Sequence, residues 1–293
     1  MKWLVGIPTY KRPEQLRKAL NSLAAQNMAP NFSVCVIDND PEGSAKEVVS
    51  EFKDNLNIIS GVETRPGVVH VRNQILDIAA DFDYLVFLDD DQVVEGRWLY
   101  EFERATEEFP GAFMAGPRSY ELPKGCLDDR LTDVTFRTPR RNKGAQIKSM
   151  PTGNSLVPVS ELSDESRRLR FDPRYSFIGG EDTKFYREHV GLGAIIRWWP
   201  DAKVVEAVPA ERASREAMEV RLRRAGHVNA MLDLEKKPRI SVMTAYLARI
   251  VIGSLAASFG CTRNLRTRGR VWRLSGTGGL EAVRGRAMKV YGV

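Results

Sequence analysis

The sequence has few cysteines and few histidines, the residues on which disulfide frameworks and zinc sites depend. Among 293 residues there are three of each. The cysteines are Cys35, Cys126 and Cys261. An odd number of widely spaced cysteines indicates neither a disulfide framework nor a CxxC metal site. The histidines are equally isolated, so we expect no histidine-based metal centre.

The sequence also lacks a long apolar run at its start. The first apolar residues end at Pro8, too soon for a secretory signal peptide. We therefore expect a cytoplasmic protein. Its composition, 43% hydrophobic and 28% charged, is that of an ordinary globular enzyme, and 293 residues are enough for one large α/β domain or two small ones.

Basic residues are unevenly distributed along the chain. Residues 240–293 hold nine Lys and Arg against one acid, Glu281, whereas residues 1–239 hold 35 basic and 37 acidic residues. A nucleic-acid enzyme usually carries its basic surface on the body of the protein. A basic tail beside an apolar segment points instead to anionic lipid, so we expect a membrane partner and no nucleic acid.

The first hundred residues alternate between short apolar runs and amphipathic segments. The apolar runs predict strands at Trp3–Ile7, Phe32–Ile37, Asn57–Val62 and Tyr84–Leu88. The segments between them predict helices from Pro13, over 44–53 and over Val68–Ala80. Strands separated by helices predict an α/β fold, a Rossmann-like and mostly parallel sheet with helices on both faces.

Polar residues follow several of these strands directly. Thr9 and Tyr10 come after the first strand, Asp38 after the second, and Asp89–Asp91 after the fourth. Ligands of such sheets collect at the carboxyl ends of the strands. We therefore expect these side chains to share one site.

The triplet Asp89-Asp90-Asp91 carries the clearest chemistry. Three adjacent carboxylates repel one another, so the cluster is costly unless a cation neutralises it. At a strand end such carboxylates can hold Mg²⁺ or Mn²⁺ through one or two oxygens and leave other positions for substrate phosphates. The alternative is a solvated acidic turn.

Five motifs together resemble the family 2 glycosyltransferases, which are inverting enzymes with a GT-A fold. They are Val-Gly-Ile-Pro-Thr-Tyr-Lys-Arg at 5–12, Val-Ile-Asp-Asn at 36–39, Arg-Pro-Gly-Val-Val-His-Val-Arg-Asn at 65–73, Phe-Leu-Asp-Asp-Asp at 87–91 and Gly-Gly-Glu-Asp at 179–182. Each motif is weak alone, but five in this order and spacing are specific. The pattern is most similar to bacterial members that extend lipid-linked polysaccharide precursors.

The resemblance implies a donor site for a nucleotide-diphosphate sugar, most often a UDP-sugar. Its residues would be Pro8, Thr9, Tyr10, Arg12, Asp38, Gly67, Arg72, Asp89 and Asp90. Within this set, Asp38 would accept a hydrogen bond from the base, Arg72 would contact the nucleotide or its phosphates, and Asp89 would face the ribose or sugar. From the residues alone, Asp38 could be a turn residue, Arg72 a surface charge and Thr9 a helix cap.

The resemblance also implies the catalytic and metal residues. Asp182 would be the general base, and Glu181 would contact the acceptor or orient the loop. Asp91 would bind the Mn²⁺ or Mg²⁺ that bridges the two phosphates. Many relatives complete this site with a histidine where this sequence has Glu206. Either Glu206 is an oxygen ligand or the metal keeps an extra water.

On this basis the chain divides into three parts. Residues 1–117 are expected to be the nucleotide-sugar-binding half, 118–237 the acceptor-binding and catalytic half, and 238–293 a helical, apolar and basic tail. Within the second part, residues 119–149 are polar and are interpreted as a long loop. Residues 275–293 are rich in glycine and are expected to be disordered or to form a short basic helix.

Residues 240–260 form the apolar part of the tail and carry one charge, Arg249. As a helix they would reach about 31 Å, close to the hydrocarbon thickness of about 30 Å, but a central arginine makes spanning costly. We predict instead a helix lying in the membrane interface, followed by arginines that reach lipid phosphates. Its apolar stripe would comprise Ile240, Met243, Leu247, Ile250 and Val251. The alternative is a helix packed on the catalytic body or on a partner subunit.

Two other functions compete with sugar transfer. A sugar-phosphate nucleotidyltransferase would need a Gly-rich phosphate loop after the first strand, where this chain has Pro-Thr-Tyr-Lys-Arg. A non-catalytic glycan-binding module would have no use for Asp182 as a base. The favoured function is therefore transfer of a sugar to an acceptor hydroxyl of a lipid-linked or cell-surface glycan precursor, at the inner face of the cell membrane.

Overall fold

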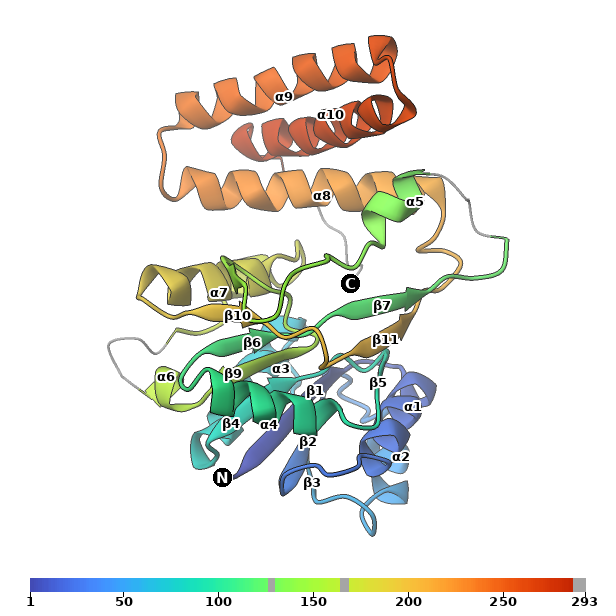
Figure 1. Cartoon of the computed structure of the whole chain (residues 1–293), viewed down its shortest axis with the longest axis vertical. Coiled ribbons are helices and arrows are strands. Elements are labelled where there is room, and N and C mark those ends of the chain that lie inside the picture. The colour runs from blue at the N-terminus through green and yellow to red at the C-terminus, as the bar shows by residue number, and fades with distance from the viewer. Residues whose placement is uncertain (126–129, 164–168, 287–293) are drawn as a thin grey trace. The chain divides into compact units, whose positions relative to one another are not determined.

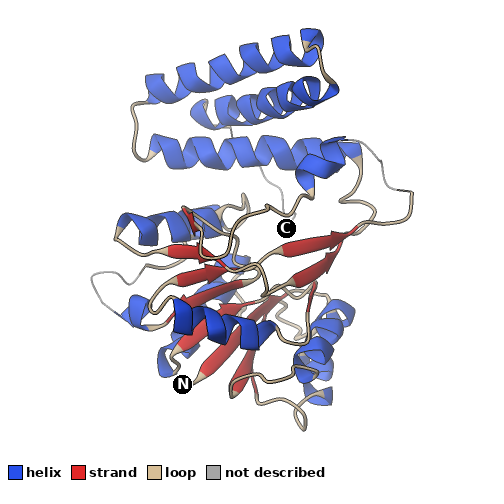
Figure 2. Ribbon diagram, viewed as in Figure 1, coloured by secondary structure: helices blue, strands red, loops and turns tan. Residues whose placement is uncertain are grey.

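A computed structural model describes residues 1–125, 130–163 and 169–286 (Figure 1, Figure 2). Cys126 and the end of the basic tail therefore lie outside the described residues. The chain forms two compact units. The sheet unit comprises Met1–Glu121, Thr138–Ser176 and Glu181–Ala207, and the helical unit comprises Leu122–Arg137, Phe177–Gly180 and Val208–Val293.

The expected division at residues 117 and 237 does not follow these units. Strands on both sides of residue 117 pair within one sheet, so the expected first and second parts share a core. The helix that ends before residue 237 belongs with the tail in the helical unit. Long-range strand pairing and helix packing, which local patterns do not report, set these boundaries.

The sheet unit is built on an eight-stranded sheet in the order β3-β2-β1-β4-β9-β6-β10-β8. The strands are β1 (Trp3–Thr9), β2 (Phe32–Asp38), β3 (Ile58–Val62), β4 (Tyr84–Phe87), β6 (Phe113–Ala115), β8 (Gln146–Ile147), β9 (Ser155–Pro158) and β10 (Ile196–Trp198). Strands β1 to β4 are parallel, as are β6 and β10, whereas β9 is antiparallel to both its neighbours. The predicted α/β fold with a mostly parallel sheet is confirmed.

A second sheet has three strands in the order β5-β11-β7, with β5 at Gln92–Val94, β7 at Arg118–Glu121 and β11 at Val204–Ala207. Strand β5 begins directly after the aspartate triplet. The interpretation of 119–149 as one long loop is wrong, because this segment includes the end of β7, helix α5 (Arg130–Thr135) and β8. Strand β7 lies at a sheet edge, where the polar sequence Arg-Ser-Tyr-Glu gives no apolar signal.

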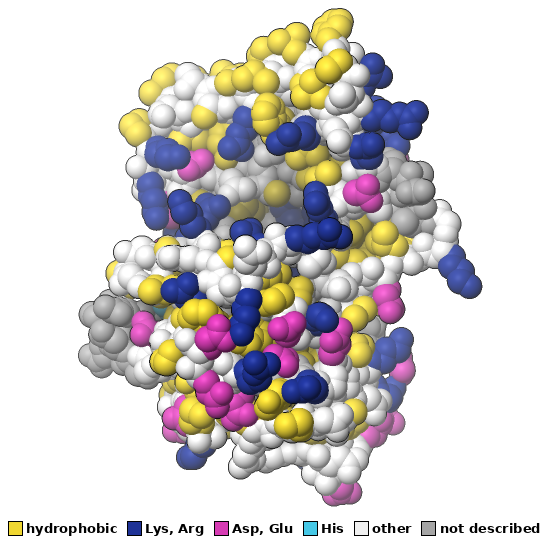
Figure 3. Space-filling view, viewed as in Figure 1, with side chains coloured by type: hydrophobic (Ala, Val, Ile, Leu, Met, Phe, Trp, Pro, Cys, Tyr) yellow, Lys and Arg dark blue, Asp and Glu magenta, His cyan; other side chains and the backbone are white. Residues whose placement is uncertain are grey.

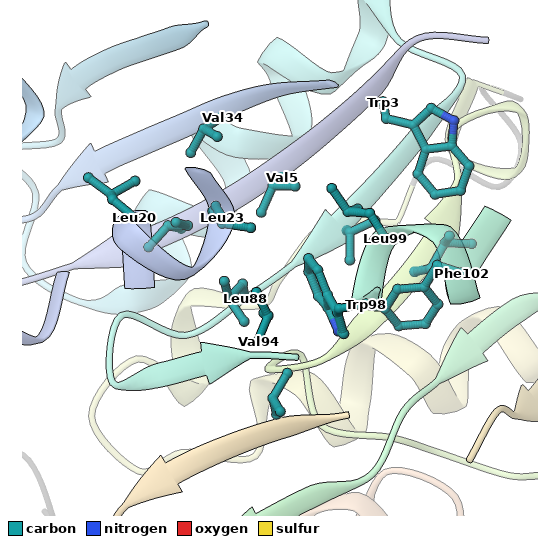
Figure 4. Packing of buried hydrophobic residues seen from close by; sticks show 14 of the residues in the cluster. Trp3, Val5, Leu20, Leu23, Val34, Leu88, Val94, Trp98, Leu99 and Phe102 are labelled. Carbon is teal, nitrogen blue, oxygen red and sulfur yellow. The ribbon is translucent and has the colours of Figure 1, made fainter. Parts of the chain in front are cut away.

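Helices cover both faces of the large sheet. One face carries α1 (Pro13–Ala24), α2 (Lys46–Glu51) and α4 (Trp98–Glu108), and the other carries α3 (Val68–Ile78) and α7 (Glu181–Gly191). The short elements are η1 (Ala79–Asp81), α6 (Ser160–Ser163) and η2 (Pro173–Tyr175). Strand β1 sends Trp3 and Val5 into the first core and Leu4 into the second, the pattern of a strand buried on both faces. Figure 4 shows Trp3, Val5 and Trp98 in the first core.

The helical unit consists of α5, α8 (Arg215–Leu234), α9 (Arg239–Phe259) and α10 (Arg263–Val283), and α10 packs against both α8 and α9. Glycines allow this close approach. A Cβ at Gly278 would lie 1.9 Å from the carbonyl oxygen of Arg223 on α8, and one at Gly253 would lie 2.6 Å from the backbone nitrogen of Arg273 on α10. The helical tail is therefore confirmed, but the expectation of disorder or a short helix over 275–293 is wrong for the described residues.

Helix α9 is, among the described residues, the one helix long and apolar enough to cross a membrane, by length and composition only. Its large apolar side chains are mostly exposed, and Figure 3 shows them gathered along this helix. This α9 apolar face comprises Ile240, Leu247, Val251, Ile252, Leu255 and Phe259. Met243 and Ile250, two residues of the expected stripe, are instead half-buried.

Candidate active site

The carboxyl ends of β1 and β4 form the centre of the candidate site. The strand order reverses between these two strands, which is where ligands bind in open α/β sheets. Gly6 of β1 pairs with Phe87 of β4. Thr9 and Asp90 each follow three residues later, and the hydroxyl of Thr9 donates to Oδ2 of Asp90 at 2.8 Å. Thr9 therefore does not cap α1, whose N-cap is Arg12. The expected meeting of Thr9 with the aspartate triplet is observed.

Arg12 also faces the triplet. Its Nη1 lies 3.1 Å from Oδ1 of Asp90 and 3.2 Å from Oδ2 of Asp91. Tyr10 is exposed beside it, and Pro8 is half-buried. The loop after β1 thus places the Arg12 guanidinium beside the aspartates, where it could also bind the phosphate of a ligand.

Asp38, at the end of β2, is buried and holds its own loop together. Its Oδ1 accepts from the backbone N–H of Asp40 at 2.9 Å, and its Oδ2 accepts from the backbone N–H of Ala45 at 2.7 Å and from the hydroxyl of Ser44 at 3.2 Å. These bonds are those of a turn residue. Contact between Asp38 and a nucleotide base remains a prediction.

The turn before α3 depends on Gly67 and on Asn39, which motif reasoning did not single out. Gly67 has φ = 111°, and a Cβ there would lie 2.8 Å from Cβ of Ser176, so no other residue fits without strain. Asn39 Oδ1 accepts from the backbone N–H of Gly67 at 2.8 Å, while its Nδ2 donates to the carbonyl of Arg65 at 2.8 Å. The side chain after Asp38 thereby fixes the loop that leads to Arg72.

Arg72, on α3, joins the strand ends to α7. It is buried, forms an ion pair with Glu181, and has Nη2 3.7 Å from Oδ1 of Asp89. A surface charge on an exposed helix is therefore excluded. Burial raises the pKa of Glu181, and the positive charge of Arg72 opposes that rise. Asp182 interacts electrostatically with both Arg72 and Glu181, so Asp89 and the Glu181-Asp182 pair share one charged cluster.

Asp182 is half-buried in the first turn of α7. Its Oδ1 accepts from the backbone N–H of Thr183 at 2.5 Å and from the Thr183 hydroxyl at 3.2 Å. The N-terminal end of a helix favours a negative charge. These contacts hold the Asp182 carboxylate in a fixed position at the start of α7.

Two residues that sequence reasoning missed support Asp89. Gln92 is fully buried, and its Oε1 accepts from the backbone N–H of Asp89 at 3.3 Å. A Cβ at Gly153 would lie 2.1 Å from Oδ2 of Asp89, so only glycine leaves room for this carboxylate. Gln92 follows the triplet directly, but nothing local in the sequence connects Gly153 with Asp89.

Glu206 lies beside the triplet because of strand register. It is buried on β11 opposite Gln92 of β5, and its Oε2 accepts from Nη1 of Arg118 at 2.9 Å. Burial and the neighbouring carboxylates of Asp89, Glu206 and Asp90 raise the pKa of Asp91 to about 7, against the opposing charge of Arg12. Asp91 therefore lies in buried surroundings with three other carboxylates close enough to disfavour its ionised form.

This donor set fits a divalent cation that is completed by substrate. Within the ranges that the structure describes, no three His, Cys, Asp or Glu side chains are arranged to hold a metal by themselves. Mg²⁺ is usually bound through one or two carboxylates together with substrate phosphates. Asp91 and Glu206 could supply the two protein oxygens, and a cation there would stabilise the ionised form of Asp91, which burial and the neighbouring carboxylates disfavour.

The mostly parallel sheet, with carboxylates at the strand ends where the strand order reverses, is typical of a GT-A fold. Comparisons with known proteins agree with this fold. The sequence matches Glycosyl transferase family 2 over residues 4–155. It is 33% identical over 237 residues to the succinoglycan biosynthesis protein ExoM of Rhizobium meliloti (strain 1021), which covers 79% of this chain and 75% of that protein. The chain therefore belongs to glycosyl transferase family 2 and is a glycosyltransferase. This family membership argues against the alternative that the protein is a sugar-phosphate nucleotidyltransferase.

Solved structures of S. aureus TarS share the fold. The complex of TarS 1–349 with UDP has a TM-score of 0.57 at 16% identity and covers 100% of this chain and 94% of that chain. The complex with UDP-GlcNAc has the same TM-score and covers 97% of this chain and 92% of that chain. This chain spans 55% of a longer TarS chain. At this identity the likeness concerns the fold.

Proposed function

We propose that this protein is an inverting glycosyltransferase that moves a sugar from a UDP-sugar to an acceptor hydroxyl of a lipid-linked or cell-surface glycan precursor. One observation carries the proposal. Buried Arg72 contacts both Asp89 and Glu181, so the acids of the donor side and the Glu181-Asp182 pair belong to one cluster. Further support comes from the role of ExoM in succinoglycan biosynthesis and from the UDP and UDP-GlcNAc complexes of TarS.

In this proposal Asp182 takes the proton of the acceptor hydroxyl. The acceptor oxygen forms a bond to the anomeric carbon on the face opposite the diphosphate. The bond from that carbon to the phosphate oxygen breaks, its electron pair leaves with UDP, and the configuration inverts. A divalent cation held by Asp91 and Glu206 would act as a Lewis acid on the leaving diphosphate. Arg12 and Arg72 would stabilise the negative charge that develops there.

Donor class and metal dependence are tested together by thermal shift. A ligand that binds only the native state raises the melting temperature by mass action. We expect UDP to raise it in the presence of Mn²⁺, and we expect EDTA or Asp91→Ala to abolish the rise. GDP and dTDP serve as matched nucleotides. A UDP response that persists unchanged in EDTA would contradict metal-dependent binding, and a response to GDP alone would contradict the donor.

The catalytic base is tested with Asp182→Asn. We expect at least about 10²-fold lower kcat, about 2.7 kcal/mol, because the acceptor proton loses its acceptor. UDP binding should be retained. Thr183→Ala, which removes only the hydroxyl that donates to Asp182, is the matched control and should cost less than about tenfold. Near-normal turnover by Asp182→Asn would remove this residue from the mechanism, and NMR of the product anomer tests inversion.

We further propose that the helical unit binds the cytoplasmic face of an anionic membrane. Its helices meet through glycines while large apolar side chains point outward, the distribution found in helices surrounded by lipid. Arg249 is exposed and lies over the ring of Tyr246 at 4.8 Å, which suits a helix in the interface better than one that spans. Exposed arginines in the first half of α10 suit lipid phosphates. They are Arg263, Arg266, Arg268, Arg270 and Arg273.

A further inference from the structure

Arg118 has no role in the site described so far, yet it lies inside the carboxylate cluster. Its guanidinium donates to Glu206 at 2.9 Å, and the two side chains are only 17% and 7% exposed. Strands β7 and β11 pair side by side, with Val204 opposite Arg118. Arg118 also interacts electrostatically with Asp89. This arginine therefore interacts with carboxylates of two different strand ends, Glu206 and Asp89.

Three arginines share the four carboxylates of this region. Arg12 pairs with Asp90 and Asp91, Arg72 with Asp89, and Arg118 with Glu206. A divalent cation and Arg118 would compete for the carboxylate of Glu206, because its Oε2 already accepts from the guanidinium. If the cation displaces Arg118, the buried guanidinium loses its hydrogen bond to Glu206 and keeps its electrostatic interaction with Asp89, and weaker neutralisation of a buried charge is unfavourable. Arg118 then needs a new anion close by.

A nucleoside diphosphate supplies such an anion when it arrives with the cation. Guanidinium groups bind phosphate oxygens through short, charge-assisted hydrogen bonds. We propose that Arg118 exchanges partners during donor binding: it neutralises Glu206 in the donor-free protein and moves to the diphosphate when a divalent cation takes Glu206. This inference rests on the proposed donor class. It makes Arg118 both a competitor of the free cation and a ligand of the nucleotide.

The two roles predict opposite effects of one substitution. In Arg118→Gln, Mn²⁺ alone, measured by electron paramagnetic resonance without nucleotide, should bind at least about threefold more tightly because Glu206 has lost its competing cation. The Kd of UDP at saturating Mn²⁺, measured by calorimetry, should rise at least about tenfold because the phosphates lose a charged donor. Arg104→Gln, which breaks a more exposed ion pair with Glu101, is the control and should change neither value.

A merely structural role for Arg118 would weaken both ligands together, and that result overturns the proposal, as does an unchanged Kd for UDP. Wild-type protein that binds neither UDP nor Mn²⁺ would instead overturn the proposed function. The double variant Arg118→Gln with Glu206→Gln leaves no unpaired buried charge, which protects folding. Compared with Glu206→Gln alone, it should show no gain in Mn²⁺ affinity and still lose UDP affinity about tenfold. A gain in Mn²⁺ affinity, or no loss for UDP, would refute the exchange.

Discussion

The two units of this protein use their interiors in opposite ways. The sheet unit buries charged side chains next to its core, among them Arg72, Asp90, Glu181 and Glu206. The helical unit has a small buried apolar cluster and glycines at its helix contacts, while the large apolar residues of α9 face outward. An interior of paired charges is suited to an anionic ligand, and an exterior of apolar side chains is suited to lipid. Substitutions at matched positions in the two units can test this contrast.

The largest effect on folding should come from a buried charge in the sheet unit. Arg72→Met leaves Glu181 and Asp89 without their guanidinium, and breaking a buried ion pair from one side costs about 3–5 kcal/mol. We expect the free energy of unfolding in urea to fall by about that amount. Arg17→Met, which breaks ion pairs at the surface with Glu14 and Glu51, should leave the urea midpoint nearly unchanged. Equal effects would show that burial does not set the strength of these pairs.

A smaller loss is expected from crowding the helical unit. In Gly278→Ala the new Cβ would lie 1.9 Å from the carbonyl oxygen of Arg223, so α8 and α10 must separate. Overpacking of this kind costs about 1–3 kcal/mol, more than alanine gains as a helix former. Hydrogen exchange followed by mass spectrometry should report faster exchange in α8 and α10. Gly191→Ala, where a Cβ meets nothing within 4 Å, is the control and should show no such change.

Because Asp91 is buried among other charged groups, the free energy of unfolding of the sheet unit should depend on pH. Its pKa is about 7 in the folded protein, well above the ordinary value of about 3.9. Below about pH 4 the group is protonated in both the folded and the unfolded state. Between about pH 4 and 7 the unfolded state releases this proton while the folded state keeps it, because burial and the neighbouring carboxylates disfavour the ionised form, so the stability present at low pH is lost as the pH rises to about 7.

In EDTA, Asp91→Asn should therefore be at least about 1 kcal/mol more stable than wild type at pH 8 and gain little at pH 4. Urea unfolding at the two pH values measures this difference. The exposed Asp201→Asn is the matched control and should leave it unchanged. A gain that is equal at both pH values would mean that ionisation of Asp91 in its buried, acidic surroundings is not the cause.

Much of the sheet could be predicted because its first four strands are apolar. β1, β2, β3 and β4 follow apolar runs, and both of their faces meet a core. β7 has the polar sequence Arg-Ser-Tyr-Glu and β8 spans only two residues, so neither contains an apolar run. Their existence depends on partners far along the chain. The glycines of α10 led to a prediction of disorder or a short helix where the structure has a long one. Their low helix propensity is overridden by close packing against α8 and α9.

The residues of the candidate site likewise fall into two groups, those that the sequence predicted and those that only the structure reveals. The motifs identified Thr9, Asp89 and Glu181, which the structure brings to one cluster, because each follows a strand or opens a helix. Arg118 and Gly153 were missed, since each acts through a contact with a residue distant in sequence. A lone arginine or glycine in a polar segment carries no local signal. Only the pairing of β7 and β11 and the approach of residue 153 to Asp89 reveal them.

Substitutions in the α9 apolar face should have the smallest effect on stability. They should, however, have the largest effect on membrane binding. Leu255 and Phe259 are 55% and 82% exposed, so replacing both by serine should change the free energy of unfolding by no more than about 0.5 kcal/mol each. If this face enters the membrane interface, each side chain contributes about 1.5–3 kcal/mol to binding when fully buried. Binding to vesicles that contain phosphatidylglycerol, measured by sedimentation, should then weaken at least about tenfold.

Val62→Ser is the matched control for this double variant, because Val62 is 45% exposed and belongs to the sheet unit. It should leave vesicle binding unchanged. Vesicles of phosphatidylcholine alone should bind the wild type more weakly, because the arginines of α10 then meet no net negative charge. Equal sedimentation of the double variant and the wild type would mean that the α9 face is covered by protein. The contrast between a polar interior and an apolar exterior would then describe an unfilled protein interface rather than a surface for lipid.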